Sequence, residues 1–510
     1  MNPAPGPSPK SWPIPAGAWL ARGKPLDWAA WLGLGGLTLL TLLRPTIEYD
    51  SWWYHLPFSG LLWNIGGGAG AFHMELRLQR RFDGFPLLME WAQGALWKLT
   101  GVLNSVVVPQ LVAAWAYFLL VPRWLGFHRV LLIALFFASP LLFIHFTATY
   151  TDLAPSLCLA IGFFLYLRLL TGELSLTTPR LACIVALLAL AANVKFQSLI
   201  ALAVLCAILL AATFALRGVE RRRRLMLAGA LALAALLGNI ATLENLVRHG
   251  NPVYPFEVQV GERTLFAGPE SLQYRKGNPN DRAPVYALRG SQMTTFPGPV
   301  NYLLSLTELD WNMRGVAPWY NIDMVTGKSP QRGGPSRTGG LGALFVVFNF
   351  GVLFLQLARY RTLADDRQRL FVILGIAIFV LTAFVPRSFE LRYWFYQPLI
   401  LIAVNARFLA ASFSGTATAA VLAAVLAAYG MLVTLASPRS GLLETHLQTR
   451  NYRAAQVPDI VRQAWKADGI YCDTTGLPLY QYSTAATGLP GRLSQRAEDC
   501  RQPAKVKDAH

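Results

Sequence analysis

"LACIVALLALAANVKFQSLIALAVLCAILLAATFAL", residues 181–216, is the stretch on which the predicted fold depends. It is too long for a single membrane crossing, which takes about 18 to 25 helical residues, and it carries Asn193, Lys195 and Gln197 near its middle. One continuous helix and a hairpin of two helices both fit this pattern. The two alternatives differ by one membrane crossing, so a loop that the first places on one side of the membrane is placed on the other side by the second. The charges elsewhere in the chain must therefore decide between the two.

The composition indicates an integral membrane protein. Apolar residues make up 54% of the 510 residues, charged residues only 14%, and the mean hydropathy is +0.39. Water-soluble chains of this length need a more charged surface. The pattern predicts an all-α polytopic fold of about eleven transmembrane helices. The predicted spans are 26–43, 102–121, 129–146, 153–170, 181–194, 197–216, 225–243, 341–358, 370–386, 393–410 and 415–436.

The basic residues favour the hairpin, because it gathers nearly all basic clusters on the cytoplasmic side. This side then receives Lys10, Arg22, Lys24, Arg123, Arg129, Arg180, Arg221–Arg224, the stretch 359–369 and Arg407. Cytoplasmic loops of membrane proteins carry such an excess of Lys and Arg. The formal net charge of +18 therefore follows from topology, and no nucleic-acid partner is expected.

Three regions follow from this topology. Residues 1–25 are expected to be a Pro-rich, disordered cytoplasmic N-terminus, 26–436 the transmembrane module, and 437–510 a small non-cytoplasmic C-terminal region. The outer loops of the module are predicted at 44–101, 147–152 and 244–340.

Two of the outer segments carry further predictions. In the first loop, FPLLMEWAQGALWKL (85–99) has apolar residues at helical spacing, which predicts an amphipathic helix on the membrane surface. The long loop 244–340 is expected to act as a lid, with an ordinary surface loop as the alternative. In the C-terminal region, a disulfide between Cys472 and Cys500 requires an oxidising compartment and is left open.

Ionisable residues gather at the outer ends of the predicted spans. They are Glu48, Asp50, Asp152, Lys195, Arg387, Glu390 and Arg392. Such groups are costly where they face lipid, so their gathering on one face indicates a water-facing site. Structural alternatives exist for single residues. Asp152 could cap the span that follows it, and the basic side chains could extend to lipid headgroups.

Glu48 and Asp50 fit these alternatives less well, because anionic headgroups repel acids. A carboxylate beside an acceptor hydroxyl can remove its proton as the hydroxyl attacks. A second carboxylate can orient the first or share a divalent cation with it. The E-x-D pair therefore indicates proton-transfer chemistry at the membrane boundary.

Five stretches occur in one order and on one side of the membrane: EYDSWWYHLP (48–57), YTDL (150–153), NVKFQSL (193–199), HGNPVYPF (249–256) and ELRYWFYQP (390–398). Together they resemble the GT-C superfamily of integral-membrane glycosyltransferases, which includes protein O-mannosyltransferases, oligosaccharyltransferase and aminoarabinose transferases. The resemblance extends to about residue 410. Region 437–510 matches no module of that superfamily.

The resemblance implies transfer of a sugar from a polyprenyl-phosphate-linked donor to an acceptor hydroxyl at the non-cytoplasmic face. It implies Asp50 as the general base, with Glu48 and Asp152 as supporting acids. Lys195, Arg387 and Arg392 would bind the donor phosphate.

Tyr54, His55, Glu390 and Tyr393 are candidates for substrate contacts, although Tyr54 also suits an interfacial aromatic. The sequence identifies no cofactor with certainty, and whether Asp50 and Asp152 hold a divalent cation is left open. The expected partners are the membrane lipid, the polyprenyl-phosphate sugar donor, and a glycan, lipid or protein acceptor. The expected location is the bacterial inner membrane, with the site on the periplasmic side.

Other classes of protein remain as alternatives. A lipid or solute transporter would also place charges inside a helical bundle, but repeated halves and charges near the midplane are typical of transporters. A non-catalytic scaffold and an O-antigen-ligase-like transferase are the remaining alternatives. Substitution of Asp50 by Asn distinguishes a glycosyltransferase from a scaffold or channel, because a scaffold or channel would tolerate this change while a glycosyltransferase would lose activity with its fold intact.

Overall fold

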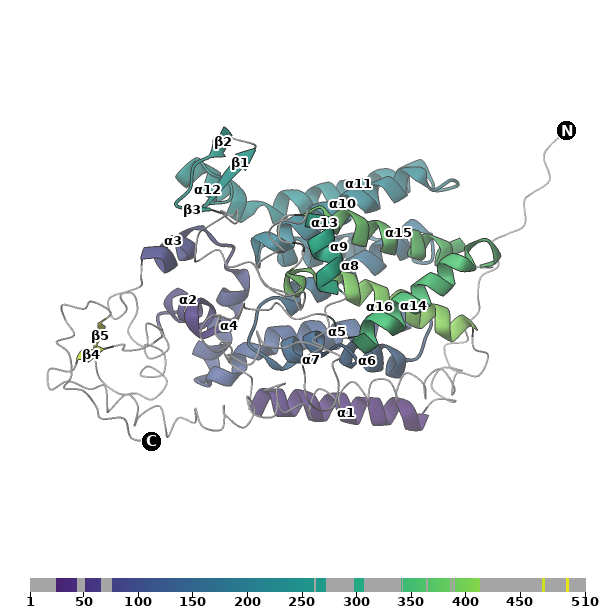
Figure 1. Ribbon diagram of the computed structural model, residues 1–510, viewed down its shortest axis with the longest axis horizontal. Helices are drawn as coiled ribbons and strands as arrows, with labels where there is room; N and C mark the ends of the chain where they lie inside the picture. The colour runs from purple at the N-terminus through teal and green to yellow at the C-terminus, as the bar shows by residue number, and fades with distance from the viewer. Residues whose placement is uncertain are drawn as a thin grey trace.

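The structure is a computed structural model of the chain. It describes residues 24–43, 51–65, 76–260, 263–271, 298–306, 341, 343–363, 366–385, 388, 390–412, 470–472 and 492–494. In this part of the chain, a bundle of long helices carries a smaller region of helices and short strands at one end (Figure 1).

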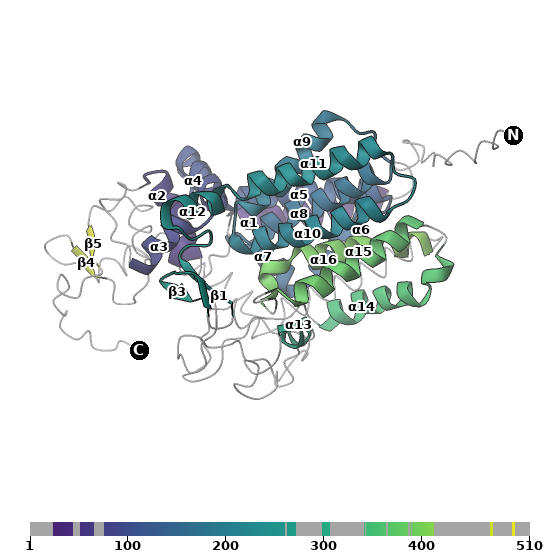
Figure 2. The same ribbon diagram turned by 90° about the horizontal axis from the view of Figure 1, so that it is seen from above.

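Apart from one bend of 99° between two short helices, the helices of the bundle run roughly along the long axis of the molecule (Figures 1 and 2). They are α1 (Lys24–Leu43), α5 (Val108–Leu125), α6 (Arg129–Phe137), α7 (Pro140–Thr147), α8 (Leu153–Leu170), α9 (Thr178–Ala192), α10 (Phe196–Ala215), α11 (Arg221–Gly238), α14 (Ala343–Ala358), α15 (Asp366–Ala383) and α16 (Tyr396–Ser412). α8 packs against α5, α9, α10 and α16. It is 89% buried and therefore forms the centre of the apolar core.

Each predicted span within the described residues coincides with one or two of these helices, and 415–436 lies outside them. Two predicted spans need correction. The span 129–146 is divided into α6 and α7, whose axes differ by 99°. The span 225–243 begins earlier, at Arg221, and continues through a 43° bend into α12 (Ile240–His249).

By length and apolar composition, three of the described helices can cross a membrane: Leu103–Leu125, which joins η2 (Leu103–Val107) to α5, together with α8 and α10. Counting each bent pair as one span raises the number to five. Apolar stretches in α1, α9, α14 and α16 are shorter. The mostly helical architecture with several apolar helices is confirmed, and the number of about eleven spans stays a prediction.

The stretch 181–216 folds as a hairpin, which confirms the prediction from the basic residues. α9 ends at Ala192, and α10 begins at Phe196. The side-chain Nδ2 of Asn193 donates to the carbonyls of Ala189 and Leu237, each at 2.9 Å. Lys195 then has an extended backbone, with φ −153° and ψ 151°. This short elbow turns the chain back along the bundle.

A smaller region lies over the end of the bundle that contains this elbow (Figure 1). It contains η1 (Ser51–His55), α2 (Leu56–Leu62), α3 (Leu76–Gly84), α4 (Leu88–Thr100), α12, and the strands β1 (Phe256–Val260), β2 (Arg263–Phe266) and β3 (Glu270–Ser271). β1 is the central strand, antiparallel to β2 and parallel to β3. The backbone N–H of Leu88 donates to the carbonyl of Asn193 at 3.2 Å, which joins this region to the elbow.

Two glycines permit close contacts within this region. A Cβ atom at Gly94 would lie 2.4 Å from the carbonyl oxygen of Ser59, so α4 approaches the backbone of α2 closely. A Cβ atom at Gly84 would lie 2.4 Å from the carbonyl oxygen of Tyr254. Beside this second contact, Arg81 of α3 binds Glu270 of β3, with 2.7 Å between Nη2 and Oε2. The segment that precedes α5 and the segment that follows α11 are thus joined directly.

The helix predicted at 85–99 is present as α4, with bounds Leu88–Thr100. Met89, Glu90, Gln93 and Trp97 form part of its buried side. Its position on a membrane surface stays a prediction.

The remaining elements are short: α13 (Gly298–Leu306), η4 (Tyr360–Thr362), η5 (Leu391–Trp394), and the parallel pair β4 (Ile470–Cys472) and β5 (Arg492–Ser494). Most of the predicted lid after Ser271, and Cys500 of the proposed disulfide, lie outside the described residues. Both predictions therefore stay open.

Candidate functional site

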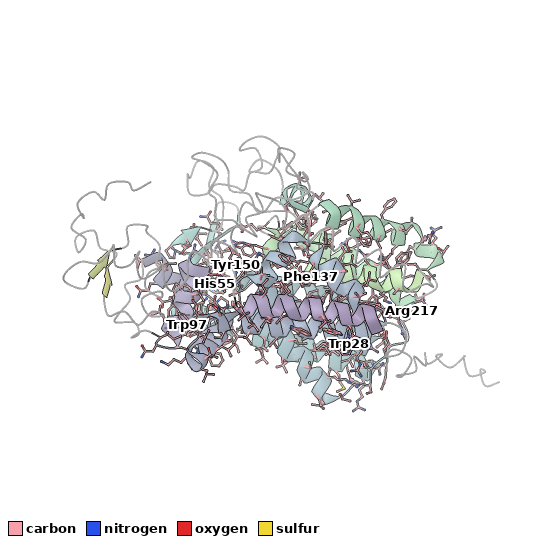
Figure 3. The ribbon with its side chains drawn as sticks, turned by 90° about the horizontal axis from the view of Figure 1, so that it is seen from below. Trp28, His55, Trp97, Phe137, Tyr150 and Arg217 are labelled. Carbon is pink, nitrogen blue, oxygen red and sulfur yellow. The ribbon has the colours of Figure 1, made fainter. Side chains whose placement is uncertain are left out.

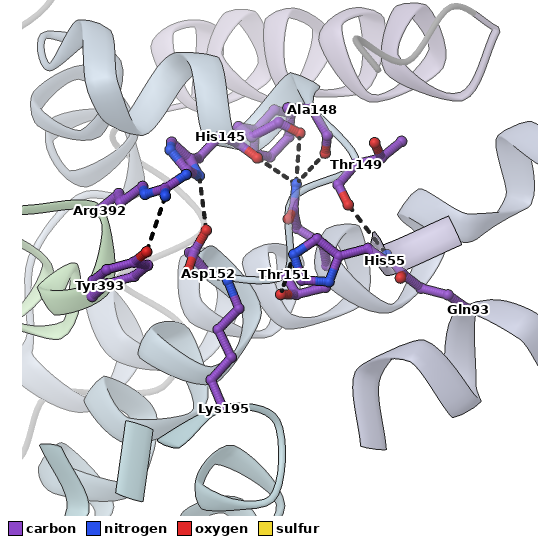
Figure 4. Close-up of polar contacts among 12 residues, drawn as sticks. His55, Gln93, His145, Ala148, Thr149, Thr151, Asp152, Lys195, Arg392 and Tyr393 are labelled. Atoms are coloured by element: carbon purple, nitrogen blue, oxygen red, sulfur yellow. Dashed lines mark hydrogen bonds and ion pairs between the residues drawn. The ribbon is translucent and has the colours of Figure 1, made fainter. Parts of the chain in front are cut away.

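A buried ion pair joins Asp152 to Lys195 (Figure 4). Asp152 directly precedes α8, and Lys195 lies in the elbow between α9 and α10. Lys195 Nζ is 2.6 Å from Asp152 Oδ1, with side-chain exposures of 11% and 0%. Asp152 occupies the N-cap position of α8 but makes no capping hydrogen bond through its side chain. Its carboxylate binds Lys195 instead.

The positive charges around Asp152 decide its ionisation. Burial alone would raise the pKa of this carboxyl, but Lys195 and Arg392 outweigh burial and lower the pKa below its usual value. Asp152 Oδ2 is 4.0 Å from His145 Nδ1 and has no hydrogen-bond partner among the described residues. The carboxylate is therefore ionised at neutral pH and engaged through one oxygen only in this part of the structure.

Arg392 approaches the same place from η5. Its Nη2 donates to the hydroxyl of Tyr393 at 2.9 Å. Its guanidinium lies over the rings of Tyr393 and Tyr150, 4.8 and 5.7 Å from their centroids. Lys195 Nζ is also 5.5 Å from the Tyr393 ring centroid. Aromatic faces attract cations electrostatically, so the two tyrosines help to hold both basic groups beside Asp152.

Two glutamines fix the connection that leads from α7 to Asp152. Nε2 of Gln110 lies 2.5, 3.1 and 3.1 Å from the carbonyl oxygens of His145, Phe146 and Ala148. Nε2 of Gln93 donates to the carbonyl of Thr149 at 3.3 Å. The last carbonyls of a helix have no partner within it. Donors from α5 and α4 therefore satisfy the end of α7 and orient the 148–152 connection.

His55 and Glu90 form a second buried pair next to this connection. His55 Nδ1 is 2.5 Å from Glu90 Oε1, and the two side chains are 1% and 3% exposed. His55 Nε2 lies 3.4 Å from Thr151 Oγ1. Burial raises the pKa of Glu90 to about 8 and lowers the pKa of His55 well below its usual value. Burial thus favours the neutral form of each partner.

The structure brings together four of the residues that the sequence predicted: Asp152, Lys195, Arg392 and Tyr393. His55 is joined to them through Thr151, which precedes Asp152. Two other candidates, Tyr54 and Glu390, are buried and lie close in the sequence to His55 and Arg392. The Tyr54 ring lies 4.0 Å from that of His55, and Glu390 is the residue before η5. The candidates Glu48, Asp50 and Arg387 lie outside the described residues.

Sequence reasoning missed the supporting residues Glu90, Gln93, Gln110 and His145. A signal was available for two of them. Glu90 and Gln93 are three residues apart in a helix whose apolar residues Met89 and Trp97 lie on the same buried side. Polar residues on the apolar face of a helix indicate a buried polar contact more than a lipid surface.

A metal site is not visible in the described part of the chain. Its residues contain no group of three or more His, Cys, Asp or Glu side chains that could hold a metal ion. Asp152 Oδ1 is occupied by Lys195. The predicted sharing of a divalent cation between Asp50 and Asp152 stays open, because Asp50 lies outside the described residues.

The architecture is similar to a crystal structure of ArnT from Cupriavidus metallidurans bound to undecaprenyl phosphate. That similarity covers 94% of this chain and 86% of the other, with a TM-score of 0.50 and 12% sequence identity. A structure of the same protein in the apo state covers 92% of this chain, with a TM-score of 0.48 and 12% identity. No protein-family model and no curated protein sequence matches the chain.

At 12% identity this likeness concerns the fold, which is similar to that of ArnT. ArnT itself is an aminoarabinose transferase of the GT-C superfamily. At the level of the fold, this similarity confirms the resemblance that the five sequence motifs indicated.

Proposed function

We propose that the chain is a glycosyltransferase that moves a sugar from a polyprenyl-phosphate-linked donor to an acceptor hydroxyl. The observation that carries this proposal is the cluster of Asp152, Lys195 and Arg392 at one end of a GT-C fold. The ArnT structure with this fold is bound to undecaprenyl phosphate. A phosphate anchored in the membrane by its lipid needs cationic donors at the edge of the apolar bundle.

Lys195 and Arg392, together with Arg387, would bind the donor phosphate. As the bond between the sugar and the phosphate breaks, the phosphate leaves with the electron pair and gains negative charge. One well-placed donor can stabilise such a transition state by about 3 to 4 kcal/mol. Asp152 would act by holding the ammonium group of Lys195 in place through the 2.6 Å contact.

Asp50 would be the general base, with Glu48 as its supporting acid. The acceptor hydroxyl attacks the anomeric carbon of the sugar, and its proton passes to Asp50. Two observations support this role. Ser51, the next residue in the chain, is fully buried, and His55 of the same short helix contacts Thr151 beside Asp152. A general base contributes about 10²- to 10⁴-fold in rate.

The site would face the periplasm in a bacterial inner membrane. The exposed Arg217 lies at the end of the bundle away from His55 and Tyr150 (Figure 3). Arg221–Arg224 follow closely in sequence, and cytoplasmic loops are enriched in such residues. A glycan, a lipid and a protein are the acceptor classes that the proposal allows.

The test compares lipid binding with sugar transfer in detergent-purified protein. Undecaprenyl phosphate binding is measured by titration, and transfer is measured from a radiolabelled polyprenyl-phosphate sugar to glycan, lipid and peptide acceptors. Lys195→Met is expected to weaken phosphate binding at least tenfold. Asp50→Asn is expected to retain binding and to lose about 10²- to 10⁴-fold in transfer rate.

Asp366→Asn, an exposed acid at the far end of the bundle, is the control and should match the wild type in both assays. Undecaprenyl phosphate binding that does not depend on Lys195 would contradict the donor-site assignment. Lipid movement across vesicle bilayers that persists in Asp50→Asn, without any sugar transfer, would instead support the lipid-transporter alternative.

A further inference from the structure

The buried pair of His55 and Glu90 connects three separate segments near the site. His55 is the last residue of η1, Glu90 lies in the first turn of α4, and Thr151 belongs to the connection before α8. One imidazole therefore contacts both other segments through its two nitrogen atoms. Gln93, one turn after Glu90 on α4, contacts the carbonyl of Thr149. α4 thus holds η1 and the 149–151 connection together.

The geometry of this pair suits a single shared proton. A contact of 2.5 Å between Nδ1 and Oε1 requires one proton between the two atoms. Glu90 Oε2 is buried and has no hydrogen-bond partner among the described residues, which is costly for an ionised carboxylate. With one proton the pair is neutral overall. With none it is an anion in the protein interior, and with two it is a cation.

We propose that Glu90 and His55 share one proton and act as positioning residues, which hold η1 against the connection that leads to Asp152; η1 directly follows Asp50 in the sequence. The kinetic consequence of this inference rests on the proposed function. Its structural consequence does not, because it concerns only how η1, α4 and residues 149–151 stay together.

The charged groups that act on the pair belong to the same site. Lys195 and Arg392 act on His55, and both favour its neutral form. Lys195 and Asp152 act on Glu90 with opposite effects. The pair therefore responds to pH through its own proton and through the charges that would contact the substrate.

The sign of the pH dependence follows from the pKa values. The pKa of Glu90 is raised on folding from 4.5 to about 8, so its contribution to stability is lost as pH rises through this interval. The pKa of His55 is lowered from 6.5, so its contribution is lost as pH falls below that value. Of the two residues, only Glu90 changes the stability between pH 6.5 and about 8. The free energy of unfolding should therefore decrease as pH rises over this interval.

The experiment measures thermal unfolding of the full chain in detergent between pH 6 and 9. The wild-type Tm is expected to fall by a few degrees as pH rises from 6.5 to about 8, and to level off at higher pH. Glu90→Gln has the same shape, can donate to Nδ1 and has no proton to lose, so this fall should disappear. The matched control is Glu244→Gln, because Glu244 forms an exposed ion pair with Arg248 on α12. The control should keep the wild-type dependence.

The kinetic arm uses Glu90→Leu, which leaves His55 without its carboxyl partner. Its kcat at pH 6.5 is expected to fall at least tenfold, while undecaprenyl phosphate affinity stays within about twofold. Glu90→Gln should lose less, and its kcat should no longer decline above pH 8. If Glu90→Leu does not fold, the kinetic test uses only the dependence of kcat on pH in Glu90→Gln.

Two outcomes would overturn the inference: the same dependence of Tm on pH in the wild type and Glu90→Gln, or a wild-type kcat profile in both Glu90 variants. Absence of sugar transfer in every variant would count against the proposed function only. The thermal measurement would still decide whether the pair shares a proton.

Discussion

The two ends of the helical bundle carry their charges in opposite ways. At the site end, Asp152, Lys195, Glu90 and His55 are almost wholly enclosed, and each has a specific partner. At the other end, Arg217, Arg221 and Arg222 are exposed. Two ion pairs there reach solvent through at least one partner: Arg367 with Glu173 and Arg369 with Asp366.

At the exposed end, the effect of the charged side chains depends on how many there are. At the site end, it depends on the geometry of each pair. Exposed arginines at a membrane boundary act together, and each can be replaced by another at little cost. An enclosed charge loses its hydration and depends on one partner, so removal of that partner leaves an uncompensated charge. Substitutions at the two ends should therefore differ strongly in their effects.

The largest effect is expected for Asp152→Asn. It leaves the ammonium of Lys195 buried without its carboxylate, and loss of one partner of a buried pair costs about 3–5 kcal/mol. Thermal unfolding in detergent measures this loss. The double variant Asp152→Asn/Lys195→Met should regain most of the stability but not undecaprenyl phosphate binding. A single variant as stable as the wild type would show that Lys195 is not buried.

Gln110→Leu should have the next largest effect. It removes the donor that contacts the carbonyls of His145, Phe146 and Ala148. A buried acceptor without a partner costs about 1–3 kcal/mol. Because the 148–152 connection leads to Asp152, the transfer rate should fall together with Tm. An unchanged kcat in a destabilised Gln110→Leu protein would show that the conformation at the end of α7 does not affect catalysis.

A pair of glycine substitutions compares packing at the site end with packing along the bundle. Gly94→Ala places a methyl group against the Ser59 carbonyl and the Trp63 ring, so it should destabilise the protein by about 1–3 kcal/mol. Gly229→Ala in α11 meets no atom within 4 Å and should stabilise the helix by about 0.5–1 kcal/mol. Opposite shifts in Tm are the expected result.

The smallest effect is expected for Asp366→Asn. The pair with Arg369 is exposed, since the Asp366 side chain is 91% accessible. No measurable change in Tm, lipid binding or transfer is expected. A large loss in any of the three assays would mean that charge at this end also depends on a specific partner.

Much of the fold could be predicted from the sequence. The hydropathy pattern gives the bounds of α8 correctly, and the basic residues predict the hairpin around Lys195. The break between α6 and α7 was missed. Pro140 stands in the first turn of α7, where proline is tolerated, and a continuous apolar run does not reveal a change of direction.

The gathering of charged residues at one end of the bundle was predictable from the sequence, but their contacts were not. Asp152, Lys195 and Arg392 were expected at one end, yet sequence alone left Asp152 as either a helix cap or a charge partner. Glu90 was assigned to a surface helix, because apolar periodicity does not distinguish a face that meets lipid from one that meets protein. Burial and distance are needed for both decisions.

The contact between Arg81 and Glu270 has a consequence for the order in which the protein assembles. The two residues are 189 positions apart in the chain. At typical synthesis rates, on the order of ten to forty seconds separate their emergence from the ribosome. Several later helices are therefore synthesised before Arg81 of α3 can bind Glu270 of β3. This contact in the smaller region thus forms late in biogenesis.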